Sequence, residues 1–352
     1  MIEVEGTHGE GGGQILRTSL AMSVLTGKVL RIRNIRARRA KPGLMAQHLR
    51  AVEAAAAISG ARVDGAKLRS SELTFEPGVI TGGEYQFDVS TAGAVTLVLQ
   101  TIAVPLAFAR LRSRVTIIGG THVPWSPSYG YLERHWAYYL RQSGFSLNTA
   151  LERAGFYPKG GGQISAEVEP VTRLLPLSLA ERGRLRKIRG CSSVACLDMS
   201  IAERQRRQAL RRLRGHCQDI EIEIRQLAAY SPGTALLLLA EFEHAQCCYT
   251  ALGARGKPAE RVADEAVDAL ERFVATKAAI DEHLADQLLL PLSVVAGTSE
   301  LSTPCVTHHL TTNADVIRSF LPVEIAIQGA TGSPGLVRIH STGLPRSLTS
   351  AN

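Results

Sequence analysis

The chain has 352 residues, which exceeds the usual size of one hydrophobic core and predicts either two domains or one core enlarged by repetition. Its composition, with 45% hydrophobic and 20% charged residues, excludes a disordered or fibrous protein and is typical of a globular α/β protein. The net charge of +8 favours polyanionic partners, although a basic surface that binds no nucleic acid would explain the same charge.

The cysteines and the apolar segments predict the compartment of the protein. The six cysteines form neither a CxxC pair nor a regular framework, so we expect reduced thiols rather than a zinc site or a disulfide scaffold. Residues 1–14 carry acidic residues and glycine, whereas a signal peptide needs a basic start and an apolar run. The longest apolar stretch, residues 96–109, is too short to cross a membrane as a helix. We therefore expect a cytoplasmic protein that does not enter the membrane.

The predicted elements repeat along the chain. A glycine turn leads into a helix from about Gln14, and a strand near residue 29, a basic loop and a second helix follow. That helix closes at ISGARVDGAKL (58–68), and the similar segment QSGFSLNTALE (142–152) closes another helix and opens another strand. The pattern predicts a repeated unit of strands and two helices. Its three copies would span about 1–80, 81–177 and 280–340.

A segment of different character, residues 178–279, separates the second copy from the third and is too long for an unstructured loop. We interpret it as a small inserted α/β domain with an arginine-rich helix at 202–216, a strand at 234–243 and an amphipathic helix at 260–275. The arginines suit RNA phosphates, but a solvated helix face explains them equally well because no aromatic residue is interleaved. The polar residues 341–352 predict a flexible tail.

The first motif with chemical meaning is GEGGGQILRTSLA, from Gly9 to Ala21. Consecutive glycines let the backbone bend closely around a ligand before a helix begins, and such a turn can receive a phosphate. The motif lacks the GKS or GKT ending of a Walker loop, and it lacks the GxGxxG spacing after a strand that is typical of dinucleotide-binding folds. Glu10 is suited to hold Mg²⁺ beside phosphates, and Arg17 follows within the helix. We therefore predict a phosphate site with a metal ligand at Glu10.

The second motif is RNIRARRAKPGLMAQHL, residues 33–49, in which a basic loop follows a strand. Guanidinium groups suit phosphate oxygens, and Arg36 and Arg39 lie where a sheet would present them to a cleft. Pro42 predicts the start of the next helix. An ordinary charged surface loop is the alternative interpretation.

The third motif is RAGFYPKGGGQI, residues 153–164, which packs an aromatic pair, a proline and three glycines into one segment. Together with the first two motifs, it resembles the RNA 3′-terminal phosphate cyclase family, and the likeness runs from residue 1 to about residue 328. The resemblance implies three copies of a two-helix, four-stranded unit plus a small inserted α/β domain. Enolpyruvyl transferases share this architecture, so the fold alone does not decide the chemistry.

The fourth motif is THHLTTN, residues 307–313, which resembles the nucleophile segment HLxTN of that family and aligns its catalytic histidine with His309. A neutral imidazole is nucleophilic near pH 7, and its phosphoramidate can pass AMP onward. The adjacent His308 is the rival nucleophile, and a pair of structural histidines is the alternative without the resemblance.

The resemblance also implies contacts to ATP. Gln100 and Pro127 would line the nucleotide site, although both could equally be ordinary helix and loop residues. His283 stands where bacterial relatives commonly carry an aromatic residue that stacks on adenine, and an imidazole stacks with less area. The neighbouring Asp286 and Gln287 would complete the ATP contacts.

The implied activity is the ATP-dependent conversion of an RNA 3′-terminal phosphate to a 2′,3′-cyclic phosphodiester through a histidyl-AMP and an RNA-adenylate. The implied cofactors are ATP and Mg²⁺ or Mn²⁺, and the implied partner is RNA with a 3′-phosphate, contacted by Gln47, Arg36 and Arg39. Two other functions remain as alternatives. A cyclase-like ribosome-assembly scaffold would lack the histidine, and an enolpyruvyl transferase would form no covalent AMP. The sequence leaves a homodimer and the physiological RNA open.

Overall fold

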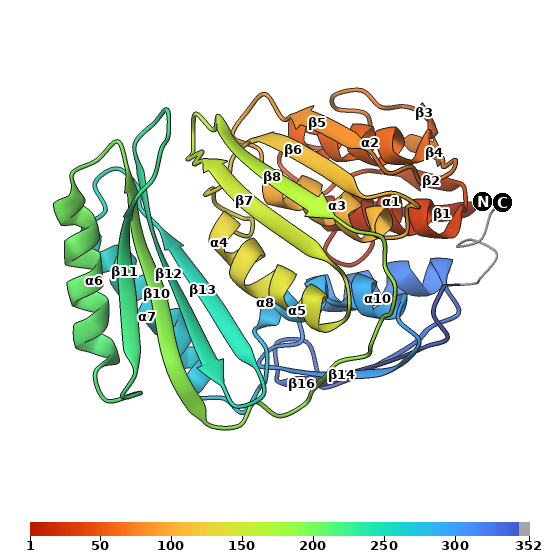
Figure 1. Cartoon of the computed structure of the whole chain (residues 1–352). Coiled ribbons are helices and arrows are strands. Elements are labelled where there is room, and N and C mark those ends of the chain that lie inside the picture. The colour runs from red at the N-terminus through yellow and green to blue at the C-terminus, as the bar shows by residue number, and fades with distance from the viewer. Residues whose placement is uncertain (345–352) are drawn as a thin grey trace.

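The fold is given by a computed structural model that describes residues 1–344 (Figure 1). Its strands form four sheets of four strands each. Three of the sheets share one order, in which the first strand lies beside the second, the second beside the fourth and the fourth beside the third. The remaining sheet belongs to an inserted segment. The predicted α/β fold, with three repeats of a two-helix, four-stranded unit and a small inserted domain, is therefore confirmed.

The first unit is a parallel strand pair joined by a helix, followed by a second helix and an antiparallel hairpin. Both of its helices end at a left-handed glycine, with φ 66 at Gly27 and φ 58 at Gly60, a conformation that side chains with a Cβ rarely adopt. Its elements are β1 (Ile2–Glu5), α1 (Gly13–Thr26), β2 (Leu30–Arg33), α2 (Ala46–Ser59), β3 (Arg62–Asp64) and β4 (Leu73–Glu76).

The second unit repeats this order, but a π-helical turn divides its second helix into three parts. Its first two strands are again parallel, and its fourth strand is antiparallel to both neighbours. Its elements are β5 (Glu84–Asp88), α3 (Val95–Leu106), β6 (Ser113–Gly119), α4 (Tyr129–Tyr131), η1 (Leu132–Trp136), α5 (Ala137–Gln142), β7 (Leu147–Arg153) and β8 (Gly162–Val168).

The third unit is split by the insert. Its first strand, β9 (Ser178–Leu179), pairs in parallel with β14, so these two residues belong to the third sheet and not to the insert that we predicted from residue 178. The last strand reaches Ser341, the first residue of the predicted tail, and residues 345–352 lie outside the described part. The other elements are α8 (Glu282–Gln287), α9 (Leu289–Ser293), β14 (Gly297–Thr303), α10 (His308–Phe320), β15 (Glu324–Gln328) and β16 (Gly335–Ser341).

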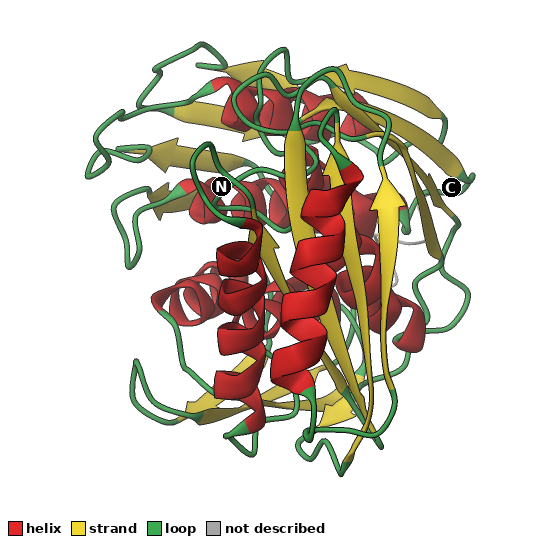
Figure 2. Ribbon diagram, turned by 90° about the vertical axis from the view of Figure 1, so that its left-hand side faces the viewer, coloured by secondary structure: helices red, strands yellow, loops and turns green. Residues whose placement is uncertain are grey.

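The insert has its own sheet and its own hydrophobic core. Figure 2 shows its two helices side by side in front of that sheet, and Figure 1 shows α6 at the outer edge of the molecule. Its elements are β10 (Leu185–Ala195), α6 (Met199–Leu213), β11 (Ile220–Gln226), β12 (Gly233–Phe242), β13 (Gln246–Leu252) and α7 (Ala259–Val274).

The helices of the three units pack together and build the main core. α1 contacts α2, α3 and α10, so the first unit is in direct contact with the second and the third. Within residues 1–344, no helix combines the length and the apolar composition that crossing a bilayer requires.

One predicted helix start is wrong. α2 begins at Ala46 and not at Pro42. Gly43 has φ 76, in the left-handed region, and Met45 is extended, so the chain between the proline and the helix cannot continue a right-handed turn. The basic loop is consequently longer than the sequence pattern indicates.

Candidate active site

The glycine turn before α1 lies against α10. Gly9 has φ 51, and a Cβ at this position would overlap the Thr312 side-chain oxygen, so only glycine fits. The backbone N–H of Glu10 donates to Thr312 Oγ1 at 3.2 Å. This close approach brings the start of the first unit to the THHLTTN segment of the third unit, about 300 residues further along the chain.

His309 lies in the first turn of α10, where Thr307 caps the helix by accepting a hydrogen bond from Leu310 N–H at 3.1 Å. Its Nδ1 is hydrogen-bonded to Gln14 Oε1, and Gln14 Nε2 donates to Asp286 Oδ1 at 3.0 Å. Because the carboxylate engages the amide nitrogen, the amide oxygen faces the ring. Nδ1 therefore carries the proton, and Nε2 keeps its lone pair.

The charge state of His309 follows from its surroundings. Burial first, and then the positive charges of Arg17, His283 and Arg39, lower the pKa of His309 to about 4. The imidazole is therefore neutral and nucleophilic at neutral pH, while its side chain stays 46% exposed. The adjacent His308 is exposed, and its side chain has no hydrogen-bond partner among the described residues.

Glu10 stands between the imidazole and a guanidinium. Its Oε1 lies 3.7 Å from His309 Nε2 and forms an ion pair with Arg39 Nη2. Its Oε2 is buried and has no hydrogen-bond partner in the described part of the chain. A free carboxylate oxygen suits Mg²⁺ or Mn²⁺. No group of three or more His, Cys, Asp or Glu side chains within residues 1–344 could hold a metal, so Glu10 fits a cation that takes its other ligands from phosphates and water.

The side chains of Arg17, Arg39 and His48 lie against the glycine turn, where a Cβ on Gly12 or Gly13 would come within 3.0 Å of them. Burial lowers the pKa of Arg17 to about 10 and also lowers the pKa of Arg36. Burial and these two guanidinium charges lower the pKa of His48 to about 3, so that ring is neutral. Arg36 Nη1 donates to the carbonyl oxygens of Lys41 and Gly43 at 2.8 and 2.9 Å. Within the described residues Arg17 and Arg36 form no ion pair, so an anion such as phosphate would compensate their charge.

Asp286 joins the first and third units behind His309. Its carboxyl group is buried, and burial raises its pKa to about 7. Asn313 Nδ2 donates to the Asp286 carbonyl oxygen at 3.1 Å, and Thr18 Oγ1 donates to Asn313 Oδ1 at 2.6 Å. These bonds hold α1, α8 and α10 in one arrangement around the imidazole.

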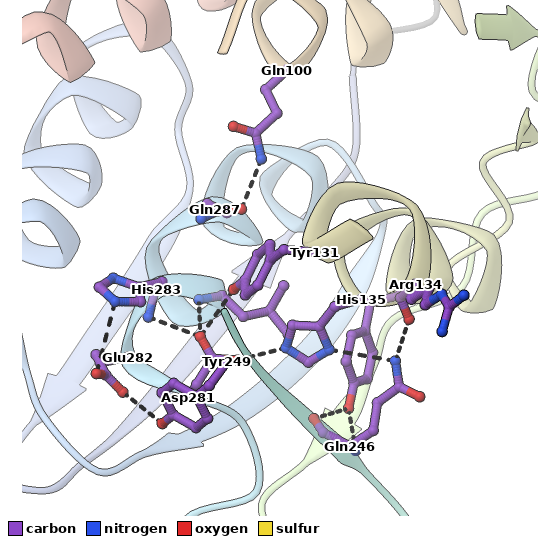
Figure 3. A network of polar contacts seen from close by, with 12 residues as sticks. Gln100, Tyr131, Arg134, His135, Gln246, Tyr249, Asp281, Glu282, His283 and Gln287 are labelled. Atoms are coloured by element: carbon purple, nitrogen blue, oxygen red, sulfur yellow. Dashed lines mark hydrogen bonds and ion pairs between the residues drawn. The ribbon is translucent and has the colours of Figure 1, made fainter. Parts of the chain in front are cut away.

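The predicted ATP contacts fall into two groups. Gln100 Nε2 of α3 donates to Gln287 Oε1 of α8 at 2.7 Å, and His283 stands 65% exposed on the same helix α8 (Figure 3). Pro127 is held at the start of α3, where its carbonyl oxygen accepts from Thr96 Oγ1 at 2.9 Å. Gln47, a predicted RNA contact, also reaches this region, because its Oε1 accepts from Ala94 N–H at 3.2 Å.

Sequence reasoning missed three polar residues that organise the site, Gln14, Thr18 and Asn313. Gln14 and Thr18 stand inside the glycine motif, and Asn313 ends the nucleophile motif. The available signal was a polar residue at a helical position that packs inside the protein, and all three are buried. Their partners come from other repeats, which the motif alone does not reveal.

A second polar network lies at the other end of α8 (Figure 3). Asp281 caps this helix by accepting from His283 N–H at 3.1 Å. Its Oδ2 lies 2.5 Å from His135 Nε2, with both side chains fully buried, and Tyr131 OH donates to its Oδ1 at 2.9 Å. No sequence motif predicted this network, because its members come from the second and third units.

Comparisons with known proteins show the family of the chain. The family model described as "RNA 3′-terminal phosphate cyclase" matches residues 8–327. A protein of that name from Ralstonia nicotianae is 46% identical over 341 residues, covering 96% of each chain. Another from Methanopyrus kandleri is 42% identical over 350 residues, covering 97% of this chain and 99% of the relative.

Among solved structures, the enolpyruvyl transferase NikO from Streptomyces tendae aligns with a TM-score of 0.42 and 12% identity over 97% of this chain and 48% of that chain. The sequence matches extend over the glycine turn, the arginine loop and helix α10, which the fold brings together. On this evidence the chain belongs to the RNA 3′-terminal phosphate cyclase family.

Proposed function

We propose that this protein converts an RNA 3′-terminal phosphate into a 2′,3′-cyclic phosphodiester at the expense of ATP, with His309 as the nucleophile. The observation that carries the proposal is the environment of His309, a neutral imidazole with Nδ1 hydrogen-bonded to Gln14 and Nε2 near Glu10. The relatives named as RNA 3′-terminal phosphate cyclases support the same activity. We also propose a cytoplasmic location, because all six cysteines are free thiols.

In the first step, the lone pair of His309 Nε2 attacks the α-phosphorus of ATP. An N–P bond forms, the bond between the α-phosphorus and its bridging oxygen breaks, and pyrophosphate leaves. The proton stays on Nδ1 because Nδ1–H donates a hydrogen bond to Gln14 Oε1. The resulting phosphoramidate therefore has a protonated ring, which makes the imidazole a good leaving group for the next step.

In the second step, an oxygen of the RNA 3′-phosphate attacks the phosphorus of the histidyl-AMP. The N–P bond breaks, and the RNA end becomes an adenylylated phosphoanhydride. The neighbouring 2′-hydroxyl then attacks the RNA phosphorus, AMP leaves with the electron pair, and the hydroxyl proton passes to solvent. This ring closure is intramolecular, so it needs mainly a held geometry.

The surrounding charges fit these steps. Arg17, Arg36 and Arg39 would hold the transferring phosphates and stabilise the charge that develops on their oxygens. Glu10 Oε2 would hold Mg²⁺ or Mn²⁺. When bound, the metal withdraws charge from the triphosphate. Gln100, Gln287 and His283 would contact the nucleotide from α3 and α8.

The site supports two other functions less well. A non-catalytic ribosome-assembly scaffold has no need of a nucleophile, yet His309 is held by Gln14 and Asp286 in a single tautomer. An enolpyruvyl transferase would act on a small anionic substrate and form no covalent nucleotide. Both alternatives predict that no AMP becomes attached to the protein.

The test is incubation with ATP labelled in the α-phosphate, followed by denaturation. We expect an acid-labile label on the wild-type protein and none on His309→Ala, with His308→Ala as the matched control that keeps the label. Label that persists in His309→Ala and disappears in His308→Ala would assign the nucleophile to His308. Absence of label from the wild-type protein would overturn the covalent mechanism.

A further inference from the structure

Three large aromatic side chains are exposed on loops of the second unit and the insert. Trp125 is 100% exposed, Tyr157 68% and Tyr230 60%. The backbone of Trp125 has φ 64, a left-handed conformation that is strained for a residue with a side chain. The other tryptophan, Trp136, is 2% exposed. Aromatic surface of this kind, held away from the core, needs an explanation beyond packing.

The three loops lie side by side. The loop after β6 is joined to the β7–β8 loop by the hydrogen bond from His122 N–H to the Gly155 carbonyl oxygen, 3.0 Å. The β7–β8 loop is joined to the β11–β12 loop by the bond from Ala154 N–H to the Ala228 carbonyl oxygen, 2.8 Å. Figure 1 shows the β7–β8 turn beside the upper ends of the insert strands. The loops that carry the three exposed aromatic residues are therefore direct neighbours in the fold.

Positive charges stand among these aromatic rings. The Arg153 guanidinium carbon lies 4.2 Å from the centre of the Tyr230 ring, and Arg153 Nε donates to the Gly161 carbonyl oxygen at 2.8 Å. Lys159 Nζ donates to the Tyr230 carbonyl oxygen at 3.2 Å. Within residues 1–344 neither Arg153 nor Lys159 forms an ion pair, so both charges remain available to an anionic ligand.

The β7–β8 loop is also connected, through direct neighbours, to residues near the proposed active site. A Cβ on Gly160 would lie 2.7 Å from the Thr91 carbonyl oxygen, and a Cβ on Gly93 would lie 3.0 Å from Gln47 Cβ. Gln47 is followed in α2 by His48, whose ring touches the glycine turn. Direct neighbours thus connect the loops that carry Trp125, Tyr157 and Tyr230, called here the aromatic loops, to the arginine cluster formed by Arg17, Arg36 and Arg39.

We propose that the aromatic loops bind the single-stranded RNA nucleotides that precede the 3′-terminal phosphate. Bases would stack on Trp125, Tyr157 and Tyr230, while Arg153 and Lys159 would contact backbone phosphates. Stacking accepts every base because each has a flat face, which suits an enzyme that recognises an RNA end and not a sequence. An acidic protein, as an alternative ligand, would pair with Arg153 and Lys159 but would not require the exposed aromatic side chains. The inference rests on the proposed function, because it assumes that the 3′-phosphate occupies the arginine cluster.

Tryptophan fluorescence tests the binding directly, because the chain has one exposed and one buried tryptophan. A 3′-phosphorylated oligonucleotide of about eight nucleotides, within the usual range of single-strand sites, should quench the emission of the wild-type protein. Trp125→Phe should remove this quenching, since Trp136 is shielded by the core. Equal quenching in the wild type and in Trp125→Phe would overturn the assignment.

Kinetic measurements distinguish a role in RNA binding from a role in the reaction with ATP. In Tyr230→Ala and Lys159→Gln, the KM for the oligonucleotide should rise by roughly ten-fold, as expected for the loss of a stacking or phosphate contact. Labelling of the protein by ATP, which needs no RNA, should stay at the wild-type level. The matched control is Arg112→Gln, an exposed cation at the opposite end of β6.

The possible failures are distinguishable. A KM for the oligonucleotide that stays within about two-fold of the wild-type value in both variants is a smaller change than the loss of one stacking contact. This result would contradict RNA binding by the aromatic loops but would leave the proposed cyclase activity unaffected. A wild-type protein that takes no label from ATP would instead refute the proposed function, whatever the fluorescence titration shows.

Discussion

At the scale of single residues, the two nitrogens of His309 have different tasks. Nδ1–H donates a hydrogen bond to Gln14 Oε1, so the proton stays on Nδ1. The free lone pair is therefore on Nε2, on the side of Glu10. Burial and nearby positive charge keep the ring neutral. The same cations that disfavour a charged imidazolium would attract a triphosphate. One cluster of arginines would therefore keep the proposed nucleophile neutral and also bind its substrate.

Gln14 is therefore predicted to be a positioning residue. Gln14→Met keeps the length of the side chain but removes the acceptor of the Nδ1 proton, so the ring is no longer held in one tautomer. Loss of a hydrogen bond that supports a developing charge costs about 1.5–3 kcal/mol, so single-turnover labelling by ATP should slow roughly 10- to 100-fold. Thermal unfolding of the variant serves as the folding control. A wild-type labelling rate in a folded Gln14→Met protein would contradict the role.

Asp286 predicts a pH dependence of stability. Its folded-state pKa, about 7, lies above the ordinary value of 3.8, so the folded protein binds more protons than the unfolded chain between these values. This carboxyl group consequently lowers the free energy of unfolding as pH rises from about 4 to 7. Asp286→Asn retains an oxygen that accepts from Gln14 but carries no charge.

We expect Asp286→Asn and the wild type to be similarly stable near pH 4. Above pH 7 the variant should be more stable by about 2–4 kcal/mol, from the size of the pKa shift. Urea unfolding at several pH values measures the difference. A stability difference that does not change with pH would show that Asp286 titrates normally.

At the scale of elements, two of the five arginines of the insert helix α6 form ion pairs with acidic residues of its neighbour α7. Arg204 pairs with Glu260 at 2.6 Å, and Arg212 pairs with Asp268 at 2.6 Å and with Glu271 at 2.5 Å. α6 and α7 pack side by side on the face of the insert sheet that Figure 2 shows. Part of the arginine density in the sequence therefore reflects helix pairing.

Arg206 and Arg207 are exposed on α6, which lies at the outer edge of the molecule, away from the repeats that form the proposed active site (Figure 1), so we expect them to contribute little to RNA binding. We expect Arg206→Glu/Arg207→Glu to leave the salt dependence of RNA affinity unchanged. A phosphate contact on single-stranded RNA adds roughly 0.7 to the slope of log affinity against log salt. Fluorescence titration at several salt concentrations, with Lys159→Gln for comparison, measures the slope. A lower slope in the double variant would place α6 on the RNA surface.

At the scale of the whole molecule, one buried network connects the insert, the second unit and the third unit. Gln246 of β13 donates to the Arg134 carbonyl oxygen at 2.7 Å, and the next residue of η1, His135, forms the buried pair with Asp281 (Figure 3). Burial alone would raise the pKa of Asp281, but the charge and hydrogen bond of His135 hold it below its ordinary value. Asp281 in turn begins α8, which carries His283.

Asp281→Asn is predicted to destabilise the protein at neutral pH. Asparagine still caps a helix, so the change removes mainly the charge opposite His135. Breaking a buried ion pair costs about 3–5 kcal/mol. Because the folded pKa of Asp281 is lowered, this stabilisation is present above about pH 4, the ordinary carboxyl value, and is lost as pH falls through the folded pKa.

Urea unfolding of Asp281→Asn at pH 7 and at lower pH tests this. The difference in stability from the wild type should disappear in acid, as for Asp286→Asn, but with the opposite sign at neutral pH, where Asp281→Asn is the less stable protein. Unchanged stability at pH 7 would mean that the pair does not hold the three parts together.

Local patterns predicted much of this protein. The glycine turn, the spacing of the helices and the repeat of about 80 residues follow from backbone freedom and hydrophobic periodicity, which are properties of neighbouring residues. The motif resemblance indicated His309, Glu10, Arg17 and Arg39. Local patterns misplaced the start of α2 and the first residues of the insert, because a left-handed glycine and a strand pairing across the insert decide those boundaries.

Only the tertiary structure decided which side chains meet. Gln14 and His309, His135 and Asp281, and Lys159 and Tyr230 each come from elements far apart in the sequence. Their contacts depend on how three similar units pack their helices against one another and against the insert. The sequence by itself determined the family and the chemical groups available, whereas packing determined the tautomer of the imidazole, the pKa values of the buried groups and the surface that lies beside the site, because these depend on distances in space.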